Sequence, residues 1–120
     1  MPYDRGVDLY LRGAANLPYQ GFDNCFANGV PKAEADLLFA TQRPAAVTQF
    51  TEPSGAPAWK HIPSWSLIGT LDHVIPPPLQ TEMASRAGSH TRRIRAGHLS
   101  LITRPGAVTR MILSAVNTTM

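Results

Sequence analysis

Cysteine is almost absent from this 120-residue chain, in which Cys25 is the single example. One thiol excludes an internal disulfide framework and a zinc site built from cysteines. A lone reduced thiol is safe in a cytosol, so we expect a cytoplasmic protein. Charged residues are also few, at 16% of the chain against about 25% in ordinary soluble proteins. With 43% apolar residues, this composition excludes an intrinsically disordered tail.

Long apolar runs are missing as well. Charge or proline interrupts each run well before the roughly 18 residues that a membrane-spanning helix needs. Near the start, Asp4, Arg5 and Asp8 stand where a secretory signal has its apolar core. We therefore expect neither a membrane span nor a signal peptide. The length allows one small domain, and eleven prolines and nine glycines predict many turns.

Acidic residues are absent from the last third of the chain. Residues 1–82 hold eight acids and five bases, a net charge of −3, whereas residues 83–120 hold six arginines and no acid, a net charge of +6. A basic end of this kind can bind nucleic acid. These arginines are spread over three predicted elements and lack interleaved aromatic residues. We therefore expect a solvated basic surface and no nucleic-acid partner.

The first sixty residues predict short elements separated by turns. Alternation over residues 8–12 is typical of a short strand. A short helix is predicted to begin at Pro44 and to run to about Phe50. Residues 52–57, EPSGAP, form a turn-rich linker and mark the expected internal boundary.

Another helix is predicted between the strand at residues 8–12 and the short helix that begins at Pro44. Pro31 is suited to the first helical position, and Pro44 disfavours helical geometry in the residue before it, so the helix ends near Gln42. The spacing i, i+1, i+4 places three residues of this helix on its buried side. They are Leu37, Leu38 and Thr41.

The second half predicts a strand, a helix, a strand and a helix. Strands are expected over residues 65–70 and 91–95, and a helix over residues 78–87 with Gly88 just after its end. Two strands joined by a helical crossover lie parallel, so their carboxyl ends share one edge of the sheet. One apolar stripe defines the last helix: Val108, Met111, Ile112, Ala115 and Val116.

Two chemically active residues follow these strands. Asp72 comes just after the first strand and His98 just after the second. Neighbouring strands lie about 4.8 Å apart, so side chains that leave their ends can reach hydrogen-bond distance. A carboxylate on one imidazole nitrogen leaves the other nitrogen free to accept a proton. An ordinary loop carboxylate and a histidine bonded to backbone are the alternative interpretation.

Other reactive side chains carry weaker signals. Cys25 could act as a nucleophile beside His98, but no neighbour in the sequence activates it, and an inert thiol is favoured. The four histidines lack the spacing of a metal site, so we expect neither metal nor cofactor. Trp59 and Trp65 flank the junction of the two halves, where packing is favoured over substrate contact.

The region around Asp72 and His98 resembles a known family. Residues 63–77, PSWSLIGTLDHVIPP, are similar to the acid-bearing segment of the α/β-hydrolase superfamily, and most of all of its small esterase-like branch, related to haloperoxidases and hydroxynitrile lyases. Residues 83–88 and 96–105 resemble the helix and the histidine loop that follow this segment. The resemblance implies that Asp72 is the acid and His98 the base of a Ser-Asp-His triad.

The resemblance also implies an architecture. Residues 30–59 are similar to the helical cap over the active site in that branch. The expected fold class is therefore α/β, a partial α/β-hydrolase fold made of a cap and the last two parallel strands with their helices. Residues 1–60 would form the cap-like segment and residues 61–120 the C-terminal βαβα part of the core.

The nucleophile of the family is missing from this sequence. None of the seven serines has glycines at both −2 and +2, so no G-x-S-x-G elbow is present. We expect a truncated hydrolase, of ester- or amide-cleaving origin, that acts on a small molecule only when a complementing N-terminal half supplies the serine. The alternative is a noncatalytic interaction module of hydrolase descent. A two-stranded sheet leaves edges unpaired, so self-association is a further expectation.

Overall fold

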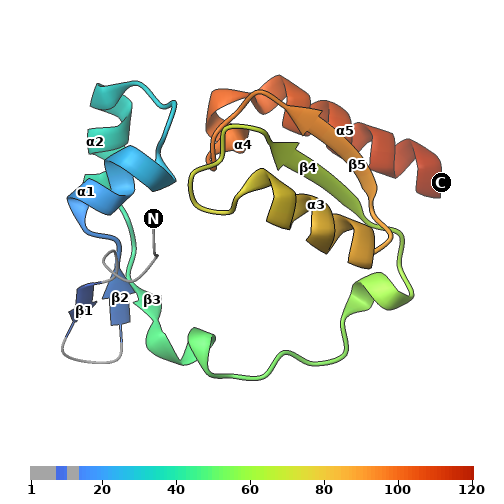
Figure 1. The fold of residues 1–120 in the computed structure, drawn as a ribbon, viewed down its shortest axis with the longest axis horizontal. Helices are drawn as coiled ribbons and strands as arrows, with labels where there is room; N and C mark the ends of the chain where they lie inside the picture. Colours follow the sequence, from blue (N-terminus) through green and yellow to red (C-terminus); the bar gives the residue numbers. More distant parts are fainter. Residues whose placement is uncertain (1–7, 11–13) are drawn as a thin grey trace.

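A long connecting segment separates two groups of elements (Figure 1). The computed structural model describes residues 8–10 and 14–120. In chain order the elements are β1 (Asp8–Tyr10), β2 (Ala14–Asn16), α1 (Tyr19–Gly21), a π-helical turn (Phe22–Phe26), α2 (Lys32–Ala40), β3 (Ala45–Ala46), two 3₁₀ helices (Val47–Phe50 and Ala58–Lys60), β4 (Trp65–Gly69), α3 (Pro77–Arg86), β5 (His90–Ile94), α4 (Ser100–Thr103) and α5 (Pro105–Thr119).

The first group is built on a small antiparallel sheet in the order β1-β2-β3. The strand predicted over residues 8–12 is present as β1, and its predicted end, Leu11 and Arg12, lies outside the described residues. The helix predicted from Pro44 is wrong in its first part. Ala45 and Ala46 pair with β2, so the chain stays extended there, and a 3₁₀ helix begins only at Val47.

The predicted first helix is confirmed as α2, but its buried face differs from the prediction. Leu37 is 63% exposed and Thr41 is exposed as well. Ala35 is buried instead, and Leu38 and Phe39 pack beside it, which is the i, i+3, i+4 stripe of a helix. The small alanine allows α2 to approach the buried cluster of the π-helical turn closely, and this contact decides which face turns inward.

A polar contact on the surface joins α1 to α2. The Tyr19 hydroxyl donates to Asp36 Oδ1 at 2.7 Å, and the Lys32 ammonium donates to both. The hydrogen bond from Tyr19, followed by that from Lys32, lowers the pKa of Asp36 below its ordinary value. The stabilisation is present above the ordinary aspartate pKa and is lost as the pH falls through the lowered one.

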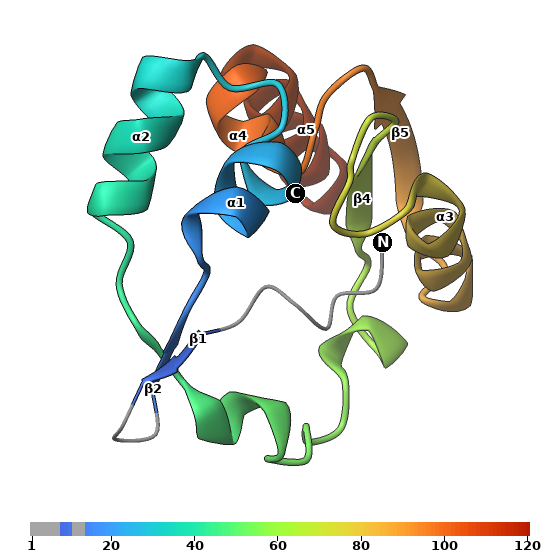
Figure 2. The same cartoon turned by 60° about the vertical axis from the view of Figure 1, so that its left-hand side comes forward.

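The second group confirms the predicted order of strand, helix, strand and helix. The strands β4 and β5 are parallel, with Trp65 opposite His90 and Gly69 opposite Ile94. The helices α3 and α5 lie on opposite faces of this pair (Figures 1 and 2). Ile68 lies in β4 between the two helices and is the one large side chain of the described residues that is fully buried. The strand β5 is exposed along most of its length.

The ends of α3 follow local rules of sequence. The helix begins at Pro77, one residue before the predicted start. At its other end Gly88 has a φ of +63°, the left-handed conformation that glycine adopts without strain. The Gly88 amide donates to the Ser85 carbonyl and the Ser89 amide to the Ala84 carbonyl, which is a Schellman motif. This turn directs the chain back into β5.

The predicted apolar stripe of α5 is buried only in part. Met111 is buried and Val108 and Ala115 are half-buried, but Ile112 is 57% exposed and Val116 is exposed too. A sheet of two strands is narrower than the stripe, so its far side meets no apolar surface. This part of the prediction is therefore wrong in the structure as it stands.

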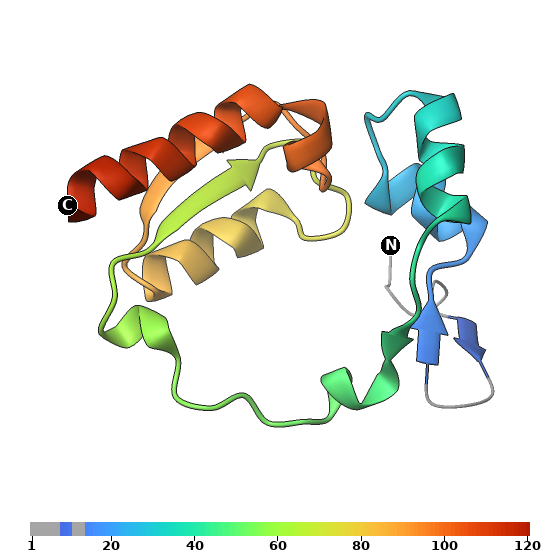
Figure 3. The same ribbon diagram turned by 180° about the vertical axis from the view of Figure 1, so that it is seen from behind.

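The chain as a whole is expanded for its length. Its radius of gyration is 16.0 Å, whereas a compact domain of this size has about 14 Å. In the part of the chain that the structure describes, hydrogen bonds between the two groups lie at the carboxyl ends of β4 and β5, where Asn28 contacts Leu71 and His98. Residues 47–64 connect β3 to β4 (Figure 3). None of the helices in the described ranges combines the length and apolar character that crossing a bilayer requires.

Candidate functional site

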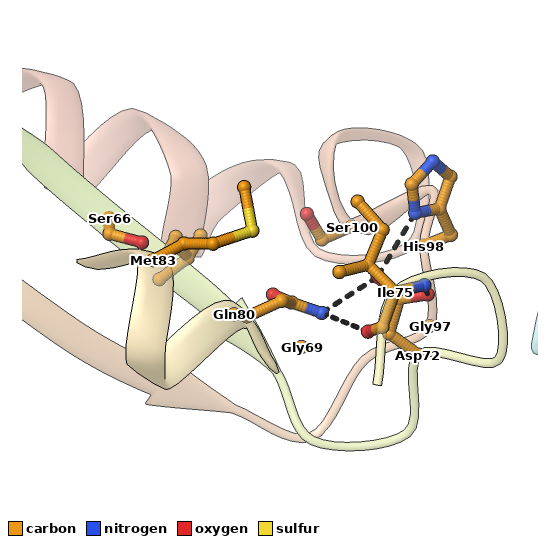
Figure 4. A pocket seen from close by; sticks show the side chains of 10 residues that line it. Ser66, Gly69, Asp72, Ile75, Gln80, Met83, Gly97, His98 and Ser100 are labelled. Atoms are coloured by element: carbon orange, nitrogen blue, oxygen red, sulfur yellow. Dashed lines mark hydrogen bonds and ion pairs between the residues drawn. The ribbon is translucent and has the colours of Figure 1, made fainter. Parts of the chain in front are cut away.

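The structure brings Asp72 and His98 together at the carboxyl ends of the two parallel strands. His98 Nδ1 lies 3.0 Å from Asp72 Oδ2 (Figure 4). Asp72 is buried, whereas the His98 side chain is 25% exposed. The carboxylate is therefore shielded from water, and the imidazole remains accessible from one side.

Four donors surround the Asp72 carboxylate. Oδ1 accepts hydrogen bonds from the amides of Val74, at 2.7 Å, and Ile75, at 3.0 Å. Oδ2 accepts from Gln80 Nε2 at 2.9 Å and faces His98 Nδ1. An ionised carboxylate only accepts hydrogen bonds, so the hydrogen of the neutral imidazole is assigned to Nδ1. Nε2 then keeps its lone pair and can take up a proton, which is the role of a general base.

The approach of the strand ends depends on a residue without a side chain. The Thr70 and Leu71 amides donate to the carbonyls of Ile94 and Ala96, so the loop after β4 continues along β5. A Cβ on Gly69 would lie 2.8 Å from the Ala96 carbonyl oxygen, a distance that real Cβ atoms do not show. Glycine at this position therefore allows the contact that sets Asp72 beside the histidine loop.

Residues 22–30, here called the cover segment, lie against the same strand ends. The Asn28 side-chain amide donates to the Leu71 carbonyl at 2.7 Å, and its oxygen accepts from the His98 backbone amide at 3.4 Å. The Phe26 ring lies 5.1 Å from the imidazole, centroid to centroid. Sequence reasoning did not find these contacts, because no local pattern links residues more than 40 positions apart.

Gly97 allows the cover segment to approach this closely. A Cβ at this position would lie 2.2 Å from the Asn28 carbonyl oxygen. We predict that Gly97→Ala displaces the cover segment and raises the rate at which half-buried Cys25, the one thiol of the chain, reacts with a disulfide reagent several-fold. Gly55→Ala is the matched control, because its Cβ would meet open space. Equal labelling rates in the two variants would contradict the prediction.

A cavity of about 240 Å³ adjoins the pair. Gln80 and Met83 of α3, Ser66 of β4 and Ser100 of α4 are among the residues that line it (Figure 4). Among the hydrogen bonds of the described residues, none joins the His98 ring to a serine, threonine or cysteine.

The remaining predicted residues lie elsewhere. Trp65 stacks on His90 with ring centroids 5.0 Å apart, and Trp59 is 39% exposed on its 3₁₀ helix. His73 Nδ1 contacts the backbone carbonyl of Asn24 in the cover segment at 3.3 Å. No group of three histidine, cysteine, aspartate or glutamate residues in the described ranges is arranged to hold a metal ion.

Comparison with known proteins gives one family match. Residues 2–111 match the model of the alpha/beta hydrolase family. No curated protein matches the sequence significantly.

Proposed function

Since this chain belongs to the alpha/beta hydrolase family, we propose that Asp72 and His98 are the acid and base of a Ser-Asp-His triad that cleaves an ester or amide. The observation that carries the proposal is the 3.0 Å contact between a buried carboxylate and a partly exposed imidazole at the ends of two parallel strands. The serine would come from a polypeptide segment outside this sequence. In this proposal residues 61–120 are the C-terminal part of the catalytic core, and residues 1–60 act as a cap of the esterase-like kind.

In the proposed reaction His98 moves the proton. Its Nε2 takes the proton of the serine hydroxyl as the oxygen attacks the carbonyl carbon, and then gives that proton to the departing alcohol or amine. Asp72 holds the hydrogen on Nδ1 and stabilises the imidazolium that forms between the two steps. Phe26 of the cover segment forms an apolar wall beside the ring, so the carbonyl of a small substrate would meet His98 out of bulk water.

Asp72 and His98 alone supply neither the nucleophile nor the oxyanion donors of the proposed reaction. Neither a G-x-S-x-G elbow nor an oxyanion-hole loop can be identified in the sequence. Members of a triad act as a unit, so an acid and a base without the serine give only background proton transfer. We infer that a complementing hydrolase half supplies the serine and the oxyanion donors.

The two edges of the small sheet differ in character, and this difference supports one place for the complementing half. β5 carries exposed Arg92 and Arg93, and charged side chains are typical of the outer edge of a sheet. β4 is apolar and its second half is buried, as in an inner strand, yet the described residues place no strand along its other edge. We propose that the partner extends the sheet along this edge of β4.

Exposed apolar side chains are available for contact with such a partner. They project from both helices that cover the sheet: Leu79 and Met83 on α3, and Ile112 and Val116 on α5. A strand added beside β4 would carry its own apolar residues on both faces and bring them within reach of these side chains. Burial of this surface is the driving force that we expect for association.

Hydrolysis of a p-nitrophenyl ester tests the proposed function. We predict that the purified 120-residue chain is no faster than buffer, because it lacks a nucleophile. Mixing or co-expression with an N-terminal hydrolase half that carries a G-x-S-x-G elbow should produce turnover, and His98→Ala should remove it. Turnover that survives His98→Ala would contradict the proposed pair.

The alternative function is a noncatalytic interaction module, and the exposed apolar side chains of α3 and α5 favour it to the same degree. Size-exclusion chromatography at several concentrations separates the two. A dimer that forms through these side chains and gains no esterase activity with the complementing half would support the module. A chain that stays monomeric at every concentration, both alone and mixed with the complementing half, would contradict both association models.

A further inference from the structure

Gln80 binds the same carboxylate oxygen that faces His98. Its Nε2 donates to Asp72 Oδ2 at 2.9 Å and to the Ile75 carbonyl at 2.7 Å. We propose that Gln80 is a positioning residue: it holds the Asp72 carboxylate in the plane that directs Oδ2 to Nδ1 of His98, and so determines which imidazole nitrogen carries the hydrogen. The effect of Gln80 on the His98 tautomer does not depend on the proposed function, whereas an effect on catalysis rests on it.

The hydrogen bonds of Gln80 leave its side chain a single orientation. A carboxamide nitrogen has two hydrogens, and both are used, one on Asp72 and one on the Ile75 carbonyl. A flipped amide would place Oε1 against two acceptor oxygens, so the reverse orientation is unfavourable. Gln80 is also half-buried, and it therefore stays where the carboxylate needs a donor.

Gln80 and the loop backbone together hold the Asp72 carboxylate in place. The Val74 and Ile75 amides hold Oδ1 but leave the second oxygen free to tilt about the Oδ1 position. The first two residues of α3 and the residue before them cannot offer amides in their place, because residues 76–78 are prolines and carry no N–H. The first hydrogen-bonding side chain that the helix presents is that of Gln80, one turn from its start, and this side chain reaches Oδ2.

Nitrogen NMR of the full chain with ¹⁵N-labelled histidine tests the inference. His98 is assigned by the signal that disappears in His98→Gln. In the unchanged chain we expect the neutral imidazole to carry its hydrogen on Nδ1. Gln80→Met keeps the length of the side chain but removes both donors, and we expect the Nε2–H form to become populated in this variant. An unconstrained imidazole favours that form.

Gln42→Met is the matched control. Gln42 is also half-buried and also clamps backbone, accepting from the Leu17 amide and donating to the Leu17 carbonyl, but it lies in the first group of elements. This substitution should leave the His98 tautomer unchanged. If Gln80→Met lowers the melting temperature while His98 keeps its hydrogen on Nδ1, Gln80 is a structural residue only and the inference is overturned.

A second variant covers the case in which Gln80→Met does not fold. Gln80→Glu has the same shape and places a carboxylate beside Asp72, so repulsion should turn Oδ2 away from His98 and shift the tautomer in the same direction. The NMR result does not depend on a serine. The two proposals can therefore fail separately. If the His98 tautomer changes with the Gln80 variants but no complementing half produces esterase activity, the proposed hydrolase is refuted and the positioning role of Gln80 stands.

Discussion

Replacing Asp72 by asparagine is expected to lower kcat by about 10⁴-fold in an assembly where a complementing half supplies the serine. The amides of Val74 and Ile75 require an acceptor at the Oδ1 position. The asparagine oxygen would occupy this position, and its NH₂ group would then point to His98 Nδ1. Nδ1 would have to accept a hydrogen bond, so the ring would carry its hydrogen on Nε2 and could not act as the base.

Steady-state esterase kinetics measure this effect, and Asp36→Asn provides the control. Asp36 is exposed and contacts Lys32 and Tyr19, away from the strand ends, so its replacement should leave kcat unchanged. A decrease of less than about tenfold for Asp72→Asn, a difference of about 1.4 kcal/mol in the activation free energy, would show that the carboxylate does not orient the base. The histidine would then need another partner.

The largest loss of stability is expected for Ile68→Ala. Ile68 has no exposed surface, and five of the eight buried apolar residues in the described ranges are alanines. Truncation of a buried isoleucine costs about 2–5 kcal/mol. Whole domains are stable by roughly 5–15 kcal/mol, and this core has few large side chains. We therefore expect the variant to lose its cooperative thermal transition.

Circular dichroism melting of Ile68→Ala beside Ile112→Ala checks this prediction. Both changes remove the same atoms, but Ile112 is 57% exposed on α5, where substitutions alter stability by about 0.5 kcal/mol or less. Equal shifts in the two melting temperatures would mean that β4 does not form the centre of the core. In the complemented assembly the cost of Ile112→Ala should increase, because the partner would bury this side chain.

Periodicity and turn chemistry predicted the elements of the second half well. Each of these elements is determined within a few residues: prolines start α3 and α5, Gly88 ends α3, and an apolar run bounded by proline and glycine forms β4. Burial was predicted less well. Leu37 satisfies the helical pattern and is exposed, because contact with the π-helical turn, which no local pattern indicates, selects the other face of α2.

The contact between Asp72 and His98 was also accessible from the sequence. Two parallel strands must end at one edge, so residues that follow them closely are brought together whatever the rest of the fold does. Gln80 was missed because its donor reaches Asp72 across a turn of prolines, and its residue type alone does not indicate this. A polar residue one turn into a helix that follows an acid-bearing loop is the signal that could have found it.

The amino-acid order by itself determined the local elements of the second half, their parallel connection and the two residues at the strand ends. These features depend on backbone geometry within short stretches, and the residue types of each stretch determine that geometry. Only the tertiary structure decided which helix faces are buried, that Gly97 admits the cover segment, and that Gln80 and Phe26 surround the acid and the imidazole. These contacts join residues distant in the chain, and their free energy depends on shape and hydrogen-bond complementarity that exists only after the elements have packed.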